Sequence, residues 1–174
     1  MGKVKTCCFT GHRPQSLPFR FDEQDSRCLR LKQALRKEIE RQIIEEGVTH
    51  FISGMAIGVD MYAAEIVLDL KGKYPQITLE AAIPCETQAV KWTVPLRERY
   101  YDIAARCDKE TMLQRHYTPD CMHKRNRYMV DTADTVIAVW NGSPSGTGKT
   151  VRYAADQGKT IVIIDPETLT VSVR

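Results

Sequence analysis

The residues best suited to chemistry lie late in the chain, in a polar, glycine-rich segment that follows an apolar run. Residues 135–140 are apolar and rich in β-branched types, which is typical of a buried parallel strand. Residues 141–148 read Asn-Gly-Ser-Pro-Ser-Gly-Thr-Gly, and helical periodicity follows. Free backbone N–H groups at such a helix start, together with the positive helix end, attract anions. We therefore expect a phosphate site in this loop, formed by Ser145, Gly146, Thr147 and Gly148.

The triplet Gly148-Lys149-Thr150 resembles the end of a Walker A loop, G-x-x-x-x-G-K-[ST]. The first glycine of that motif would fall at position 143, which is Ser143, and Gly142 lies one residue too early. No convincing Walker B strand follows. The spacing therefore favours a phosphate-binding loop without ATP hydrolysis. The helix is expected to begin close to Lys149, which itself could contact a phosphate or face solvent.

Two earlier glycine turns, 10–14 and 53–60, also follow apolar runs and carry polar side chains. They bring together small residues that allow close backbone approach and side chains that can donate or accept hydrogen bonds. The candidate ligand-binding residues in these turns are Gly11, His12, Arg13, Ser53, Gly54, Gly58 and Asp60. For Asp60 two interpretations stay open, namely contact with a ligand and bracing of the helix start.

A carboxylate and a basic cluster complete the candidates. Glu86 follows the third apolar run, and residues 123–127 read His-Lys-Arg-Asn-Arg on a predicted helix. A solvated charged face is the simple interpretation of that cluster. Arg125, however, is followed by apolar residues at helical spacing, which favours a partly buried guanidinium that reaches a phosphate, with Asn126 beside it.

The elements that position these residues alternate along the chain. Apolar runs predict strands at 4–9, 48–53, 78–83, 110–113, 135–140 and 160–164, with an edge strand at 169–173. Helical spacing predicts helices at 28–43, 59–70, 93–106 and 120–132, and a last helix that Gly158 ends. This order predicts an α/β fold: one Rossmann-like, doubly wound domain over residues 1–174, with a mainly parallel sheet and helices on both faces. Ligands bind such sheets outside the carboxyl ends of the strands, where the loops above would meet.

Composition agrees with an ordinary globular protein. Of 174 residues, 43% are hydrophobic and 27% charged, and the net charge of +3 does not demand a nucleic acid partner. No apolar run is long enough to span a membrane, and no signal peptide precedes the first strand. The six cysteines form no C-x-x-C pair, which favours a reduced, cytoplasmic setting. The spacing of His116, Cys121 and His123 matches no common zinc module, so we expect no metal.

Several of these motifs carry a resemblance to the SLOG superfamily. Ser53-Gly-Met-Ala-Ile-Gly-Val-Asp60 resembles the signature of DNA-processing protein A, and the segments around 123–126, 133–134 and 145–147 resemble the LONELY GUY hydrolase block. Together with Thr10-Gly-His-Arg-Pro14, Trp92 and the segment 124–131, they are most similar to the YpsA-like group. The resemblance spans essentially the whole chain. It implies a Rossmann-like domain that binds a nucleotide or nucleotide-derived ligand, and a homodimer, because related proteins often pair.

The chain departs from both motifs in ways that bear on function. Thr150 stands where the hydrolases carry a glutamate, so the carboxylate that assists glycosidic bond cleavage is missing. Ile57 and Ala64 replace an Arg and a His that are common in the DNA-processing motif. The leading hypothesis is therefore binding, or sensing, of a nucleotide or related phosphorylated ligand. A nucleoside-phosphate N-glycosidase, with Glu86 as a substitute carboxylate, is the first alternative, and a single-stranded DNA-binding accessory protein is the second.

Overall fold

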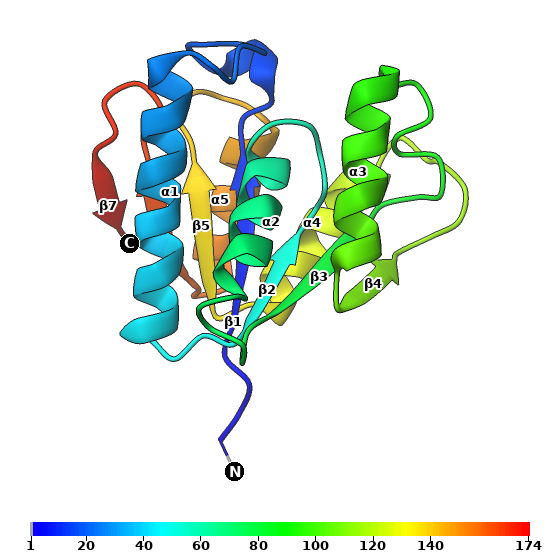
Figure 1. Ribbon diagram of the computed structural model, residues 1–174. Helices are drawn as coiled ribbons and strands as arrows, with labels where there is room; N and C mark the ends of the chain where they lie inside the picture. The colour runs from blue at the N-terminus through cyan, green and yellow to red at the C-terminus, as the bar shows by residue number, and fades with distance from the viewer. Residues whose placement is uncertain (1) are drawn as a thin grey trace.

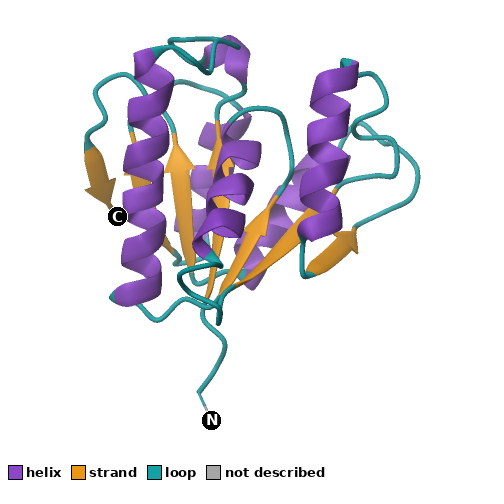
Figure 2. Ribbon diagram, in the orientation of Figure 1, coloured by secondary structure: helices purple, strands orange, loops and turns teal. Residues whose placement is uncertain are grey.

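The computed structural model describes residues 2–174, which form a seven-stranded sheet with helices on both faces (Figures 1 and 2). The strands are β1 (Thr6–Gly11), β2 (His50–Ser53), β3 (Thr78–Ile83), β4 (Lys109–Met112), β5 (Thr135–Val139), β6 (Thr160–Ile164) and β7 (Val171–Val173). The helices are α1 (Ser26–Ile44), α2 (Val59–Leu70), α3 (Val94–Arg106), α4 (Cys121–Thr132) and α5 (Gly146–Asp156), and a short 3-10 turn, η1 (Pro14–Ser16), follows β1.

The sheet has the strand order β4-β3-β2-β1-β5-β6-β7. Strands β1 to β6 pair in parallel, and β7 joins the edge antiparallel to β6. The chain therefore moves outward from β1 to β4 and then returns to the other side of β1 with β5. This reversal leaves a crevice outside the carboxyl ends of the central strands. The predicted α/β class, with a doubly wound and mainly parallel sheet, is confirmed.

Two apolar layers hold the helices to the sheet. Helices α1, α2 and α3 cover the face seen in front in Figure 1, and α4 and α5 lie behind the sheet. Strand residues alternate between the layers: Phe9 and Phe51 stack in the first, and Cys8 and Ile52 lie in the second. Both faces of the central strands are buried, which explains why they appear in the sequence as continuous apolar runs.

Strand β1 runs further than its sequence pattern predicted, to Gly11 instead of residue 9. Gly11 pairs with Val139 of β5, so the glycine belongs to the sheet. A Cβ atom at Gly11 would lie 2.5 Å from a methyl group of Val59, so only glycine lets α2 pack this closely on the strand. The longer β1 therefore ends directly at the loop that contains His12 and Arg13.

Cysteines and helices add two further observations. All six cysteines are free thiols and five of them are buried, where they pack as small apolar side chains. No helix within residues 2–174 combines the length and the apolar character needed to cross a bilayer.

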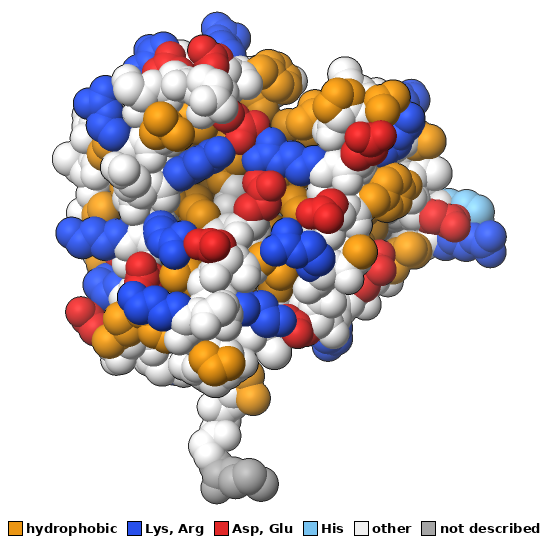
Figure 3. All heavy atoms as spheres, in the orientation of Figure 1, with side chains coloured by type: hydrophobic (Ala, Val, Ile, Leu, Met, Phe, Trp, Pro, Cys, Tyr) orange, Lys and Arg blue, Asp and Glu red, His pale blue; other side chains and the backbone are white. Residues whose placement is uncertain are grey.

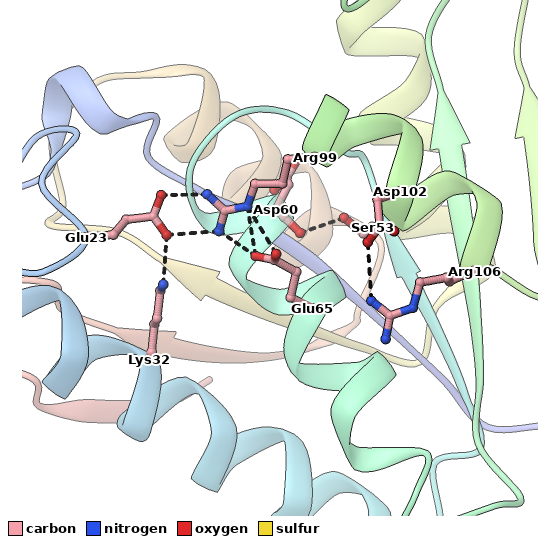
Figure 4. Close-up of polar contacts among 8 residues, drawn as sticks. All are labelled: Glu23, Lys32, Ser53, Asp60, Glu65, Arg99, Asp102 and Arg106. Carbon is pink, nitrogen blue, oxygen red and sulfur yellow. Dashed lines mark hydrogen bonds and ion pairs between the residues drawn. The ribbon is translucent and has the colours of Figure 1, made fainter. Parts of the chain in front are cut away.

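A network of ion pairs joins the three helices of the front face. Figure 4 shows Arg99 of α3 between Glu23, which precedes α1, and Glu65 of α2. Arg99 Nη1 lies 2.6 Å from Glu23 Oε2, and Lys32 Nζ lies 2.8 Å from the other oxygen of the same carboxylate. Although burial opposes it, hydrogen bonds from Arg99 and Lys32 hold the pKa of Glu23 below its usual value. The network therefore fixes the end of the long β1–α1 connection, which begins at His12.

A buried carboxylate braces the opposite side of the sheet. Glu80 of β3 is 1% exposed and accepts hydrogen bonds from Tyr128 Oη of α4 and Thr111 Oγ1 of β4, at 2.5 and 2.8 Å. His50 Nε2 of β2 lies 2.8 Å from the other oxygen and must donate, because a carboxylate can only accept. Burial alone would raise the pKa of this carboxyl, but these hydrogen bonds outweigh it and lower the pKa of Glu80 to about 2.

Replacing Glu80 tests how far this network holds α4 on the sheet. We expect Glu80→Ala to lower the free energy of unfolding by about 3 kcal/mol, because it removes a buried side chain and leaves three half-buried donors without their acceptor. Denaturant unfolding at pH 7 measures the change. Glu110→Ala is the matched control: Glu110 is exposed on β4, and its loss should cost no more than about 0.5 kcal/mol. Equal losses in the two variants would contradict the account.

The same carboxylate should make the free energy of unfolding depend on pH in the acidic range. The pKa of Glu80 in the folded protein is about 2, below the value of about 4.3 for an unfolded glutamate. Its contribution is therefore complete above the unfolded pKa and is lost as the pH falls through the folded one. The stability difference between the native protein and Glu80→Gln should shrink between about pH 4 and pH 2. A difference that stays constant over this interval would show that the charged form carries no stabilisation.

Candidate functional site

A cavity of about 350 Å³ lies outside the carboxyl ends of β1 and β5, at the reversal of strand order. It is built from the loop after β1, the start of α2, the first turns of α4 and the start of α5. Many of the residues predicted from the sequence line it, namely Gly11, His12, Arg13, Asp60, Arg125, Asn126, Ser145, Gly146 and Thr147. Residues that the sequence did not single out for this site also line it, namely Thr10, Gln15, Ser16, Ala56, Met122 and His123.

Helix α5 points its first turn at this cavity. It begins at Gly146, so the predicted start close to Lys149 is wrong. The reason is Ser145, whose side chain caps the helix by accepting a hydrogen bond from Gly148 N at 3.1 Å. Gly146 and Thr147 have N–H groups without a hydrogen-bond partner anywhere in residues 2–174. Two free backbone donors at the positive end of a helix therefore line the cavity.

Arg125 places a buried cation in the same cavity. Its side chain is 3% exposed, and Nη1 donates to the carbonyl oxygen of Gly54. Nε donates to Asn126 Oδ1 at 2.8 Å, whereas Nη2 has only the sulfur of Met122, at 3.8 Å. Burial lowers the pKa of Arg125, and the charge of Asp60 opposes this effect. A guanidinium stays protonated in proteins, so Nη2 is a charged donor with spare capacity.

Gly54 is required for this placement of Arg125. A Cβ atom at position 54 would lie 2.8 Å from Cζ of the guanidinium, so any side chain there would displace it. The Gly54 carbonyl also accepts from Gln88 Nε2 at 3.2 Å. The Ser-Gly turn after β2 and the basic cluster on α4 therefore act as one unit, although 71 positions separate the bonded residues.

Asp60 supplies the cavity with a carboxylate. It lies in the first turn of α2, and Oδ2 accepts from Ala56 N at 3.3 Å. Ser53, which is fully buried, donates its hydroxyl to the Asp60 carbonyl at 2.8 Å, and Gly58 caps the helix. Burial raises the pKa of Asp60, while the charges of Arg125 and Arg13 and the Ala56 N–H act against it. Asp60 thus braces the turn after β2 and also faces the cavity, so the two interpretations are compatible.

His12 joins the loops on either side of the crevice. Its Nε2 lies 3.0 Å from Asn141 Oδ1, and Ser143 N donates to the same oxygen at 3.0 Å. Burial lowers the pKa of the His12 imidazole. The ring therefore positions the β5–α5 loop, a role for which Asn141 gave no sequence signal. Arg13 is exposed at the cavity and forms no ion pair within residues 2–174.

Five predicted residues are not among those that line the cavity: Ser53, Gly54 and Gly58, which belong to the turn after β2, and Glu86 and Gly148. Glu86 is exposed in the loop after β3, and its carboxylate lies 3.3 Å from Arg115 Nε. The Gly148 N–H is used by the Ser145 cap, as described above. Thr150, at the position of the hydrolase glutamate, donates its hydroxyl to the Gly146 carbonyl at 3.1 Å. Among the residues that line the cavity, Asp60 is the one that carries a carboxylate.

The chain is similar in sequence to known bacterial proteins. YoqJ, an uncharacterized SPbeta prophage-derived protein of Bacillus subtilis, is 33% identical over 138 residues, which cover 72% of this chain and 81% of YoqJ. A UPF0398 protein of Bacillus velezensis is 25% identical over 156 residues, which cover 88% of this chain and 85% of that protein.

Solved structures of DNA processing protein A share the fold. The Streptococcus pneumoniae protein superposes with a TM-score of 0.65 at 18% identity, covering 95% of this chain and 52% of its own. The Helicobacter pylori protein, described for its single-stranded DNA binding mode, gives a TM-score of 0.61 at 19% identity, covering 92% of this chain and 65% of its own. This chain thus spans half to two-thirds of those longer proteins, and at such identities the likeness concerns the fold alone.

A sequence profile for YpsA, the YspA SLOG family, matches residues 7–169. This match includes every loop that builds the cavity and all the strands except β7 and the first residue of β1. The chain therefore belongs to the YspA SLOG family.

Proposed function

We propose that the cavity binds a nucleotide or a nucleotide-derived phosphorylated ligand, with a phosphate held between Arg125 and the first turn of α5. The observation that carries the proposal is the pairing of a buried, charged guanidinium with two unpartnered backbone N–H groups in one cavity. Charge-assisted hydrogen bonds to phosphate are stronger than neutral ones, and helix starts bind phosphate through the same donors.

The remainder of the cavity suits the sugar of a nucleotide. Asp60 presents carboxylate oxygens, which accept hydrogen bonds from hydroxyl groups, and Asn126 and Gln15 add amide groups. Arg13 lies at the cavity without a carboxylate partner and could neutralise further negative charge. Together with the family membership, this supports a nucleotide more than a bare phosphate ion.

Removing one N–H group at the helix start tests the phosphate position. Gly146 is the first residue of α5, where proline is well tolerated, and a Cβ atom added there would meet no other atom within 4 Å. We expect Gly146→Pro to keep the fold and to weaken binding of nucleoside monophosphates by about tenfold, the loss of one charge-assisted hydrogen bond. Calorimetry with adenosine, guanosine, cytidine and uridine monophosphates measures the change.

Gly146→Ala is the matched control, because it adds a side chain at the same place and keeps the N–H group. It should bind the monophosphates as the native protein does, within about twofold. Equal affinity of the proline and alanine variants would remove the helix start from the site. Absence of binding to every monophosphate by the native protein would contradict the proposal as a whole.

We also propose that the site binds its ligand without cleaving a glycosidic bond. Glycosidases ordinarily need two carboxyl groups, and only Asp60 lines this cavity, while Thr150 uses its hydroxyl on the helix backbone. Incubation with nucleoside monophosphates should release no free base, as measured by chromatography. Release of base that Asp60→Asn abolishes would instead establish a hydrolase with a single essential carboxyl.

Single-stranded DNA is a second candidate ligand, supported by the fold shared with the Helicobacter pylori protein. Proteins of this kind usually stack bases on aromatic side chains along a basic groove. No Phe, Tyr or Trp lines the cavity of about 350 Å³. We therefore expect only weak binding of a labelled oligothymidylate at about 200 mM salt, measured by fluorescence polarisation. Tight binding that weakens steeply as salt increases would favour the DNA candidate.

A further inference from the structure

A second cavity, of about 410 Å³, lies beside the first, between α4 and α5. His123 and Asn126 line both cavities, so the two form a continuous surface. The second cavity adds Arg127 from α4 and Lys149 and Arg152 from α5. We call this group of three cations, together with His123, the α4–α5 basic cluster.

The cations of the α4–α5 basic cluster form no ion pairs within the described residues. Arg127, Lys149 and Arg152 are exposed, and no carboxylate lines their cavity. The opposite face differs. There, Figure 3 shows blue and red side chains interspersed over α1, α2 and α3, where Arg36 and Arg99 contact carboxylates. The concentration of unpaired positive charge on α4 and α5 is therefore a local property that the modest net charge conceals.

The helix dipoles do not account for this arrangement of charge. A helix is stabilised by acidic residues in its first turn and basic residues in its last turn. Neither α4 nor α5 has a basic residue in the last turn, whereas α1 and α3 carry Arg41 and Arg106 there. Arg127 and Arg152 instead lie near the middle of their helices, and Lys149 lies in the first half of α5, so the dipole stabilises none of them. Stability does not explain this placement, but binding of an anion does.

We infer that the α4–α5 basic cluster is a subsite for a second phosphate, so that the ligand is a nucleotide with two phosphate groups. This inference rests on the proposed function, because it takes the first phosphate to lie at Arg125 and the start of α5. From there the surface shared by His123 and Asn126 leads directly to the cluster. The second phosphate could be linked to the first, as in a 5′-diphosphate, or attached to the 3′ side of the ribose, as in a 3′,5′-bisphosphate. Both kinds of ligand present a phosphate anion to the cluster.

A small ligand fits these observations better than a polymer. Tyr153 is the one Phe, Tyr or Trp residue that lines either cavity. Its ring already faces the guanidinium of Arg127, with Cζ 5.4 Å from the ring centre, and its hydroxyl donates to Asp131 at 2.7 Å. The continuous surface therefore lacks a row of free aromatic rings for successive bases. Cations that have no free aromatic rings beside them are suited to bind the phosphate groups of a nucleotide more than its bases.

Ligands that differ by one phosphate test the inference. Calorimetry would compare each nucleoside monophosphate with its 5′-diphosphate and its 3′,5′-bisphosphate. We expect the native protein to bind one of the doubly phosphorylated forms about tenfold more tightly than the monophosphate. Arg152→Gln should remove most of this preference and leave monophosphate affinity unchanged. Arg30→Gln, the same substitution at an exposed position of α1, should leave both affinities unchanged.

The outcomes separate this inference from the function on which it rests. Equal affinity for singly and doubly phosphorylated forms, with monophosphate binding still sensitive to Gly146→Pro, would overturn the second subsite and leave the proposed function standing. Binding of no form would overturn the proposed function itself. A preference that Arg152→Gln does not reduce, or tight binding of an oligothymidylate in place of every doubly phosphorylated form, would also overturn the inference. The relative affinities of the diphosphate and the bisphosphate identify which source supplies the second phosphate.

Discussion

The candidate site depends on the hydrogen bond from the Arg125 guanidinium to the carbonyl oxygen of Gly54. A buried cation is costly unless its donors are occupied, and this bond satisfies one of them, while Nη2 contacts only the sulfur of Met122. The bond exists only because position 54 lacks a side chain. It ties α4, which lies on one face of the sheet, to the loop that leads from β2 to α2, and α2 lies on the other face. Much of the surrounding polar structure serves to keep that loop in place, including the Ser53 and Asp60 contacts and the second bond from Gln88.

Supporting networks lie further from the cavity and act through the elements that carry it. The pairing of Arg99 with Glu23 and Glu65 fixes the end of the β1–α1 connection, whose beginning lines the cavity. The buried Glu80 holds Tyr128 of α4 against the sheet, one turn after the guanidinium of Arg125. Charge thus positions the loops and helices, while apolar packing in two layers supplies the frame. This division explains how segments far apart in the sequence are held around one cavity.

The sequence predicted the fold because its signals are local. Apolar runs and helical spacing identify the elements, and the boundaries of α2, β3 and β6 agree with the structure. The start of α5 was misplaced because Gly-Thr-Gly is a poor helix sequence, and only the Ser145 cap reveals that the first turn is formed. Within the site, residue spacing and the family resemblance were enough to identify the glycine turns and Arg125 as candidates. The bond between Arg125 and Gly54, the contact of Asn141 with His12 and the remote position of Glu86 depend on tertiary packing, for which a single sequence carries no signal.

The central claim is that a phosphate sits at the first turn of α5 beside Arg125. Its most direct test is to follow the backbone amide resonances of Gly146 and Thr147 by NMR during a titration with adenosine, guanosine, cytidine and uridine monophosphates. The account predicts saturable downfield shifts of both amide protons with at least one of these ligands, because each N–H group gains a charged acceptor. Saturable shifts elsewhere in the protein, with both of these amide resonances unmoved, would contradict it.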